Sequence, residues 1–530
     1  MNFIEAAIFL LFLAIISVPL ANRLRLPLEI FLVIGSCLIS LLPGLPVFQV
    51  NPLIVFNLFL PPILFSAAYF TSWKDFKFNL RPISLFAFGL VIFTMITVAI
   101  VAKLLLPEFT WGEGFLLGAI LSPTDASAAV NIIKKIGANR RLIVILEGES
   151  LINDATALTL FRFSLAGLML NTFSITNAIS HFLFALAGGA IIGLILGVVA
   201  IYFIRRIRET SAETTFTFIV AYIAYLTAEH LGVSGVISTV VCGIYVGIRF
   251  PECVPTDTRV NAKVSWKTLM FIINGFAFTL LGLELPWVLK SLTSYSAVSL
   301  VFYVVAITIT VILTRLLWVY PAAYLPRKLV PSIVKKDPMP VWQMLFTLGW
   351  TGMRGIVSLA AALAIPLEMA PGVAFPHRDL LIFLTYFVVV ATLIMPSISL
   401  PFLIKIFNLS DAPQIKMQQE AYARMKSLEG VLEKIAEIVR NEKIPSYLFD
   451  EFKTQIQRRI EIIQTQLQAN PYSTLNSEYF AIKKLTMAAI ESEKETLIKL
   501  RKSGEIQDEI FHLLLDELDL EEMRAKSLRI

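Results

Sequence analysis

Long runs of apolar residues, separated by short polar loops, fill the first 410 residues of the chain. A helix needs about 17 to 25 mostly apolar residues to cross the hydrocarbon core of a bilayer. Thirteen runs fit that description, and each predicts a spanning helix: 4–21, 27–43, 51–70, 82–105, 113–133, 142–170, 178–204, 213–231, 233–249, 266–288, 296–324, 340–365 and 379–407. The pattern therefore predicts an all-α polytopic membrane protein.

The composition changes near residue 410. Charged residues make up only 16% of the whole chain, against about 25% in soluble proteins, yet they crowd in from Asp411 onward. Apolar residues recur there at helical spacing, as at Leu428, Val431 and Leu432. We therefore expect a transmembrane domain, residues 1–410, and a cytoplasmic α-helical tail, residues 411–530. A small helical bundle is the favoured form of the tail, and a pH-sensing or autoinhibitory regulator is the alternative.

Basic residues gather in alternate loops between the predicted spans. One set of loops holds most of the Lys and Arg residues, whereas the other set holds only Lys103, Lys290 and Arg378. Cytoplasmic loops are the ones enriched in Lys and Arg, so the N-terminus is predicted to lie outside and the tail in the cytoplasm. The net charge of +6 thus reflects membrane topology and does not indicate nucleic-acid binding.

The fifth predicted span is interrupted by the segment Ser122–Ser127. Pro123 removes a backbone donor and clashes with the preceding turn, and Thr124 and Asp125 follow at once. The freed carbonyls, the hydroxyl and the carboxylate are oxygen donors of the kind that bind small cations in broken transporter helices. The alternative is a proline kink with a structural aspartate.

The sixth predicted span carries a cluster of polar residues. Helical spacing places Glu147, Ser150 and Asp154 on one face, and Glu149 and Asn153 on a neighbouring face. Charged groups inside a membrane are costly and are usually functional. Because few basic residues are available at that depth, the cluster predicts an ion site rather than structural ion pairs.

The twelfth predicted span contains Gly349, Gly352 and Gly355 around an intramembrane arginine, Arg354. Spans five and twelve are seven apart and so run in opposite directions, as in an inverted repeat of spans one to six and eight to thirteen. Paired broken helices in such repeats point to a central binding site. We expect Arg354 to be the counter-charge of an acid on span six, Glu149 in the first place.

Two further arginines, Arg162 and Arg315, lie nominally within spans. We expect Arg162 near the external end of its helix, and Arg315 either with a structural partner or snorkelling to the interface.

Oxygen ligands suit hard monovalent cations, and a buried carboxylate that holds either a cation or a proton exchanges the two by competition. Alternating access then needs only movement of the loaded site relative to a scaffold. The chain contains no GxxxxGK[ST] phosphate loop and no GxGxxG fingerprint in the tail, so no nucleotide is expected. With no zinc motif among its cysteines and histidines, we expect no cofactor, and a secondary transporter rather than an enzyme.

These motifs resemble those of the monovalent cation–proton antiporters, specifically the bacterial sodium/proton exchanger branch with an Asn-Asp pair. The resemblance covers residues 1–410 and is most specific at Gly148–Ala155, with support from Ser122–Asp125 and Gly352–Gly355. It implies a core bundle, formed by spans four to six and eleven to thirteen, that moves against a dimer-forming scaffold. It also implies the bacterial inner (plasma) membrane as the location, and sodium and protons as the transported ions.

The resemblance further implies roles for individual residues. Asp154 is the alternating carrier of cation and proton. The other residues at the sodium site are Asp125, which binds through water or supports the site, Thr124 and Ser150. The residues that support the site are Asn153, Glu149, Arg354 and Pro123. Asn153 interacts with Glu149, and Glu149 pairs with Arg354.

Two features bear on stoichiometry. Family members with an Asn-Asp pair, here Asn153 and Asp154, usually exchange one sodium for one proton, which is electroneutral. In several relatives the third span carries an acid after a Leu-Pro-Pro motif, where this chain has Ser66. Ser66 offers an oxygen but no charge, so the third-span ligand differs from that of those relatives.

Three alternatives remain at this stage. The first is an antiporter of the same fold for potassium, lithium or calcium. The second is an intramembrane aspartyl protease, which also needs two membrane-embedded aspartates, although Asp125 and Asp154 lack its Tyr-Asp and Gly-x-Gly-Asp contexts. The third is a passive cation channel, whose flux would not be coupled to protons.

Overall fold

The structure is a computed structural model that describes residues 3–24, 27–40, 55–137, 139–170, 175–290, 295–370, 372–409, 413–441, 446–468, 475–503, 505 and 507–527. The chain divides into two compact units, Met1–Ser410 and Asp411–Ile530. The boundary coincides with the change in composition near residue 410.

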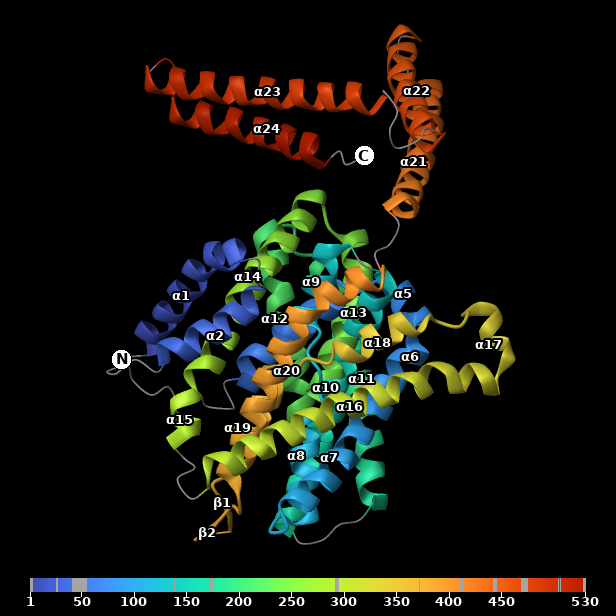
Figure 1. Cartoon of the computed structure of the whole chain (residues 1–530). Helices are drawn as coiled ribbons and strands as arrows, with labels where there is room; N and C mark the ends of the chain where they lie inside the picture. Colours follow the sequence, from blue (N-terminus) through green and yellow to red (C-terminus); the bar gives the residue numbers. More distant parts are fainter. Residues whose placement is uncertain are drawn as a thin grey trace. The chain divides into compact units, whose positions relative to one another are not determined.

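The first unit, Met1–Ser410, is called the membrane unit below, and it is built almost entirely of helices (Figure 1). Its first half contains α1 (Phe3–Leu24), α2 (Leu28–Ser40), η1 (Val55–Phe59), α4 (Leu60–Tyr69), α5 (Trp73–Phe78), α6 (Leu80–Ser84), η2 (Leu85–Leu90), α7 (Val91–Leu105), α8 (Trp111–Leu121), α9 (Ser127–Ile136) and α10 (Arg140–Leu170). The second half contains α11 (Ile175–Ile204), α12 (Thr210–His230), α13 (Gly235–Cys253), α14 (Thr256–Leu283), α15 (Leu285–Lys290), α16 (Ala297–Leu329), α17 (Pro331–Lys336), α18 (Trp342–Trp350), α19 (Ile356–Leu363) and α20 (Arg378–Ile406).

The helices match the predicted spans in position. In the described part of the chain, six segments are long and apolar enough to cross a membrane on their own: Leu80–Leu105, Ser180–Ile204, α13, α14, α16 and α20. The bent pair of α1 and α2 qualifies when counted as one span. The prediction of an all-α polytopic membrane protein is confirmed, while the exact number of crossings stays a prediction. The beginning of the predicted span 51–70 lies outside the described residues.

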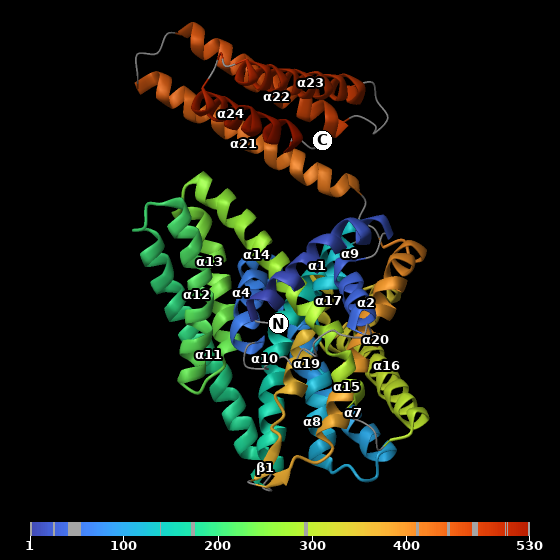
Figure 2. The same cartoon turned by 90° about the vertical axis from the view of Figure 1, so that its left-hand side faces the viewer.

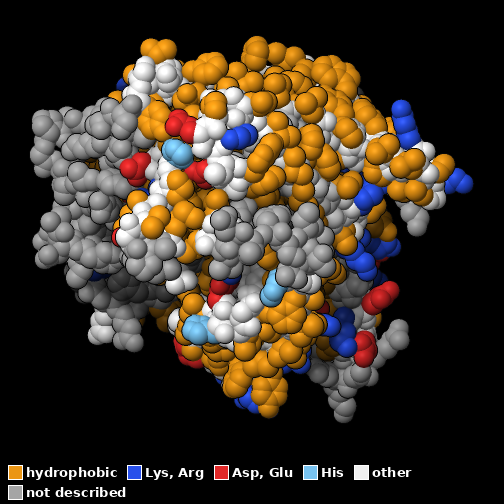
Figure 3. All heavy atoms as spheres, turned by 90° about the horizontal axis from the view of Figure 1, so that it is seen from below, with side chains coloured by type: hydrophobic (Ala, Val, Ile, Leu, Met, Phe, Trp, Pro, Cys, Tyr) orange, Lys and Arg blue, Asp and Glu red, His pale blue; other side chains and the backbone are white. Residues whose placement is uncertain are grey.

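Large apolar side chains cover much of the outer surface of the membrane unit. Val298 and Leu317 on α16, and Phe184 and Ile191 on α11, are all more than half exposed. Figure 3 looks from below the view of Figure 1 and shows hydrophobic side chains spread over much of that face. In water such patches would cause aggregation, so their physical explanation here is contact with lipid.

Two helices are interrupted near the middle of the membrane unit, as predicted. α8 ends at Leu121 and α9 begins at Ser127, while α18 ends at Trp350 and α19 begins at Ile356. The two unwound segments, 122–126 and 351–355, meet directly, because the backbone N–H of Asp125 donates to the Met353 carbonyl at 2.8 Å. Pro123 accounts for the first break, since it supplies no amide hydrogen for a continuous helix.

Beyond the spans, an arginine cluster fixes the segment between α16 and α18. Arg81, Arg141 and Arg327 each form an ion pair with Asp337, at 2.6, 2.8 and 2.6 Å respectively. Partial burial by itself would raise the pKa of Asp337, but the hydrogen bonds from Arg327 and Arg141 outweigh it and hold the pKa below its ordinary value. One carboxylate therefore ties the ends of α6, α10 and α16 together.

A short hairpin that was not predicted precedes α20. Strand β1 (Glu368–Ala370) pairs antiparallel with β2 (Val373–Ala374), with Glu368 opposite Ala374. Gly372 in the turn has a φ of 79°, a left-handed conformation that glycine adopts without a steric cost.

The second unit consists of the helices α21 (Pro413–Asn441), α22 (Ser446–Gln468), α23 (Leu475–Lys502) and α24 (Asp508–Ser527). Figure 2 shows them as long rods that pair side by side, and α21 packs on α22 and α23 on α24. Ile490, Leu518 and Ala525 form a small buried cluster between α23 and α24. This small cluster agrees with the polar composition of the unit.

Candidate functional site

Three of the predicted site residues meet at the first helix break. The Thr124 hydroxyl donates to Glu149 Oε1 at 2.8 Å, and the Asn153 amide donates to both the Thr124 carbonyl and its hydroxyl, at 3.0 and 2.9 Å. All three side chains are buried. Asn153 therefore reaches Glu149 through the Thr124 hydroxyl and not by the direct contact that the sequence resemblance implied.

The predicted ion pair between Glu149 and Arg354 is wrong. Glu149 instead forms an ion pair with Arg315 of α16. The two Nη atoms of Arg315 donate to the two carboxylate oxygens, and Nη2 lies 2.8 Å from Oε2. The side chains of Arg315 and Glu149 are 1% and 2% exposed. Such a bidentate, fully buried pair is among the strong charge-assisted interactions in proteins. Of the two expectations for Arg315, a structural partner is correct and snorkelling is wrong.

Arg354 donates hydrogen bonds to backbone carbonyls at the helix breaks. Its Nε donates to the Leu121 carbonyl at 3.2 Å and its Nη1 donates to the Gly352 carbonyl. Leu121 is the last residue of α8, where the carbonyls lack intrahelical partners and a cation is favourable. Arg354 thus binds the end of one broken helix to the unwound segment of the other.

Glycines at the second break make this crossing possible. A Cβ atom on Gly355 would lie 2.7 Å from Asp125 Cβ and 3.0 Å from Asp125 Cγ, while one on Gly352 would lie 2.8 Å from Arg315 Nε. Real Cβ atoms do not approach that closely without displacing a neighbour. The glycine pattern of span twelve, which suggested a loosened helix, therefore reflects the close approach of two charged side chains.

We expect Gly355→Ala to destabilise the membrane unit by about 1–3 kcal/mol through overpacking against Asp125. The φ of Gly355 is −119°, a value that alanine accepts, so the cost is steric. Gly35→Ala on α2 is the matched control. Its Cβ would meet nothing within 4 Å, and the helix should gain about 0.5–1 kcal/mol. Thermal unfolding of both variants in detergent measures the difference, and an unchanged midpoint for Gly355→Ala would contradict the close contact.

The carboxylate of Asp154 lies on α10, one turn beyond Ser150, and the residue is 8% exposed. In the part of the chain that the structure describes, no group donates a hydrogen bond to it. Asp125 Oδ1 accepts the backbone N–H of Ser127 at 2.8 Å, and the two aspartates interact electrostatically. Asp154 therefore keeps its oxygens available beside a second acid, at the level of both helix breaks.

Further oxygen atoms lack partners near this level. Asn153 Oδ1, and Ser358 Oγ two residues into α19, are buried without a hydrogen-bond partner among the described residues. Unpaired buried polar atoms are rare in native proteins and call for an explanation. Asn153 Oδ1 and the carboxylate of the neighbouring Asp154 are oxygen donors of the kind that suits a hard cation.

The remaining predicted residues lie around this centre. Ser150 is half-buried on the same face of α10 as Asp154, and Pro123 is buried in the unwound segment. Ser66 is 6% exposed on α4, a helix that contacts α10 and α13. Among the described residues, no hydrogen bond joins Ser66 to another predicted site residue.

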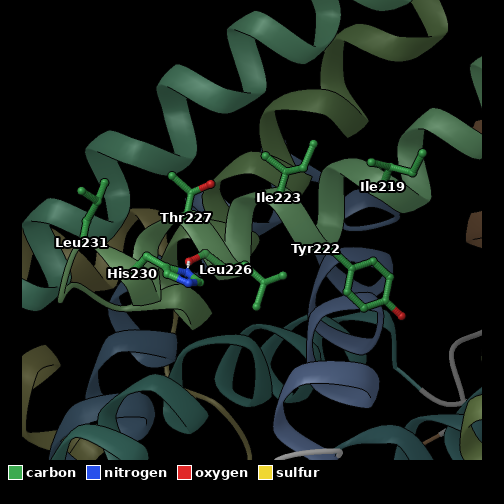
Figure 4. Close-up of a pocket in the computed structure, with 7 residues that line it drawn as sticks. All are labelled: Ile219, Tyr222, Ile223, Leu226, Thr227, His230 and Leu231. Atoms are coloured by element: carbon green, nitrogen blue, oxygen red, sulfur yellow. Dashed lines mark hydrogen bonds between the residues drawn. The ribbon is translucent and has the colours of Figure 1, made fainter.

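A separate groove of about 650 Å³ runs along α12. Figure 4 shows its wall as one helix face with mostly apolar side chains, one threonine and one histidine: Ile219, Tyr222, Ile223, Leu226, Thr227, His230 and Leu231. None of the predicted site residues lines it. The groove is therefore part of the apolar outer surface and not of the ion site.

Two residues were not singled out as site members by the sequence: Arg315, and Ser358 with its unpaired hydroxyl. A signal for Arg315 was present, since it stands far inside the apolar run 296–324, beyond the reach of simple snorkelling. No sequence signal marked Ser358.

The chain resembles known exchangers along most of its length. It matches the family described as "Sodium/hydrogen exchanger, transmembrane" over residues 8–406. It is 29% identical to the low-affinity Na(+)/H(+) antiporter NhaS1 of Synechocystis sp., with 94% of this chain and 92% of that protein aligned. It is 28% identical to a "Sodium, potassium, lithium and rubidium/H(+) antiporter" of Bacillus pumilus, with 99% and 78% aligned.

The fold is also that of a solved structure. The sodium proton antiporter MjNhaP1 from Methanocaldococcus jannaschii superposes with a TM-score of 0.60, over 76% of this chain and 97% of the other, at 17% identity. The family match includes both broken helices and the Asn153–Asp154 pair. The chain therefore belongs to the sodium/hydrogen exchanger family.

Proposed function

We propose that this protein is a secondary antiporter that exchanges sodium ions for protons across a membrane, with Asp154 as the shared binding group. The observation that carries the proposal is the position of Asp154. Its buried carboxylate receives no hydrogen bond from the described residues and stands beside Asp125, where two broken helices cross. Family membership and the names of the relatives support the same activity.

Competition at one carboxylate gives the exchange. A buried, unpaired carboxylate is unfavourable, and either a proton or a cation relieves that cost, but the two compete for the same oxygens. Sodium from one side would displace the proton, and after the site has turned to the other side a proton would displace sodium. The site with neither ion bound would carry an unpaired buried charge and is disfavoured. It would therefore change sides only when sodium or a proton is bound, which couples the two fluxes.

The neighbouring residues would complete the sodium site with oxygen atoms. Asp154, Ser150 and Thr124 would be direct ligands, and Asp125 would bind through water or shape the site. The Thr124 hydroxyl already donates to Glu149 and accepts from Asn153 and Arg315, so Thr124 would bind sodium through its backbone carbonyl, together with the other carbonyls of the unwound segment. Ser66 would supply at most a neutral oxygen.

The residues around the breaks would hold this geometry during transport. Glu149 with Arg315 anchors α10 to α16, Asn153 anchors α10 to Thr124, and Arg354 joins the second unwound segment to the end of α8. A core that contains both breaks can then move as a body against a scaffold. We further propose a homodimer in a bacterial inner membrane, with the N-terminus outside and the tail in the cytoplasm. With one carboxylate as carrier, the exchange would be electroneutral.

Reconstituted vesicles that contain a pH-sensitive dye would test the function. Sodium, lithium, potassium and calcium are added in turn, with and without an imposed membrane potential. Proton movement driven by sodium and insensitive to the potential is the expected result. A stronger response to potassium would transfer the proposal to the wider cation range named for the Bacillus pumilus relative. Cation flux without proton movement would indicate a channel and would refute the antiporter.

A further inference from the structure

The arginine cluster around Asp337 carries more positive charge than its one carboxylate balances. Each arginine pairs with Asp337 at 2.8 Å or less, and the three come from α6, the start of α10 and the end of α16: Arg81, Arg141 and Arg327. Three positive charges against one negative charge leave an excess of two. Like charges repel more strongly in a partly buried place than in water, so the cluster would be stabilised by a further anion.

Two of the arginines keep free donor groups and stay accessible. Of the side-chain nitrogens of Arg81, only Nη2 has a hydrogen-bond partner among the described residues. Arg141 uses Nε for Asn79 and Nη2 for Asp337, which leaves its Nη1 without a described partner. Their side chains are 28% and 26% exposed, so a group from outside the protein can reach them. Arg327, by contrast, is 4% exposed and all its nitrogens have partners.

Further basic side chains surround the arginine cluster, and acids are scarce there. The exposed lysines on α5, α16 and α17 are Lys74, Lys77, Lys328 and Lys335. Asp75 is the one acid in the sequence of α5, α6, α16 and α17, and it is already paired with Arg140 at 2.6 Å. Figure 1 shows α17 and the end of α16 projecting from the packed helices. These basic residues therefore make an accessible surface that attracts anions.

Large apolar side chains are exposed beside the basic ones. Phe78 and Leu80 lie at the junction of α5 and α6, and Leu329 lies at the end of α16; all three are exposed. Trp73 and Trp342 are exposed as well, and tryptophan is enriched where a membrane meets water. Apolar and basic side chains, mixed at the ends of spanning helices, match a lipid headgroup with its acyl chains better than a soluble anion.

We propose that Arg81 and Arg141 bind the phosphate group of an anionic phospholipid, whose acyl chains lie along the exposed apolar side chains of α6 and α16. Guanidinium groups bind phosphate oxygens through paired N–H donors, and basic sites between spanning helices bind anionic lipid headgroups. The lipid would neutralise the excess charge and strengthen the junction of α6, α10 and α16. This site is separate from the ion site and does not depend on the proposed exchange.

A purely structural role makes a different prediction. The three arginines could serve only to join three helices through Asp337. Arg81→Gln separates the two roles, because Asp337 keeps Arg141 and Arg327 as partners and the variant should fold. A structural role predicts the same loss of stability with every lipid. Lipid binding predicts that the response to an anionic lipid is weakened in particular.

The experiment follows the thermal unfolding midpoint of the full chain in a neutral detergent during titration with short-chain phosphatidylglycerol. For the wild type we expect the midpoint to rise and then saturate, while phosphatidylcholine, which has no net charge, should raise it little. For Arg81→Gln the half-saturating concentration of phosphatidylglycerol should increase about fivefold, because one basic residue near a membrane surface contributes about 1 kcal/mol to the binding of anionic lipid. Arg81→Lys keeps the charge and should recover part of that loss.

Arg208→Gln is the control with the same change of charge. Arg208 is an exposed arginine between α11 and α12, so its removal should leave the half-saturating concentration unchanged. Equal half-saturation in the wild type and Arg81→Gln, or an equal increase in Arg208→Gln, would overturn the proposal. The wild type alone also tests it: an equal response to phosphatidylcholine would refute the anionic site, and equal stabilisation by inorganic phosphate at the same ionic strength would refute the lipid.

Discussion

Asp154→Asn is expected to abolish cation-driven proton movement, with a loss of at least about a hundredfold, since general acid–base groups alone contribute that much. Asparagine has nearly the same size as aspartate, but its amide neither binds and releases a proton near neutral pH nor offers a negative charge to sodium. Because Asp154 receives no hydrogen bond from the described residues, the substitution breaks no contact there. The variant should therefore fold and remain in the membrane.

The measurement is dye-reported proton movement in vesicles with equal amounts of each protein. Asp257→Asn is the matched control, since Asp257 is an exposed acid in the first turn of α14 and should leave the rate unchanged. Wild-type rates in a folded Asp154→Asn variant would refute Asp154 as the shared binding group. An unfolded variant would show instead that Asp154 also stabilises the fold.

Arg315→Met is expected to destabilise the membrane unit by about 3–5 kcal/mol, because it leaves the Glu149 carboxylate buried without its counter-charge. Removal of both charges, in Glu149→Gln with Arg315→Met, should cost less than the arginine substitution alone. Thermal unfolding in detergent, with the wild type and the two single variants, gives the interaction free energy between the two side chains. A coupling near zero would contradict the ion pair.

The same cycle distinguishes the two buried arginines. Arg354→Met combined with Glu149→Gln should show a much smaller coupling, because Arg354 donates to the backbone carbonyls of Leu121 and Gly352. The reverse order of the two couplings would restore the pairing of Arg354 with Glu149 that the sequence suggested.

Local patterns were sufficient for several features of this protein. A proline followed by threonine and aspartate inside an apolar run predicted the first helix break, and a run of glycines predicted the second. Polar residues at helical spacing on span six predicted which acids share a face. These inferences hold because hydropathy, helix periodicity and the backbone conformations open to proline and glycine each depend only on a few neighbouring residues.

Partners across helices could not be predicted in the same way. Two arginines, Arg315 and Arg354, lie deep inside predicted spans and could each pair with Glu149. The spacing of residues along the chain does not reveal which of them does. Asn153 was expected at Glu149 and instead binds Thr124.

By itself, the sequence determined that the chain is a polytopic helical membrane protein with two broken helices and a cluster of buried acids. The tertiary structure decided that Arg315 neutralises Glu149 and that Arg354 ties the broken helices together. The physical reason is that helix formation and membrane insertion are local properties of each segment. The rotation and crossing of the packed helices decide which side chains meet.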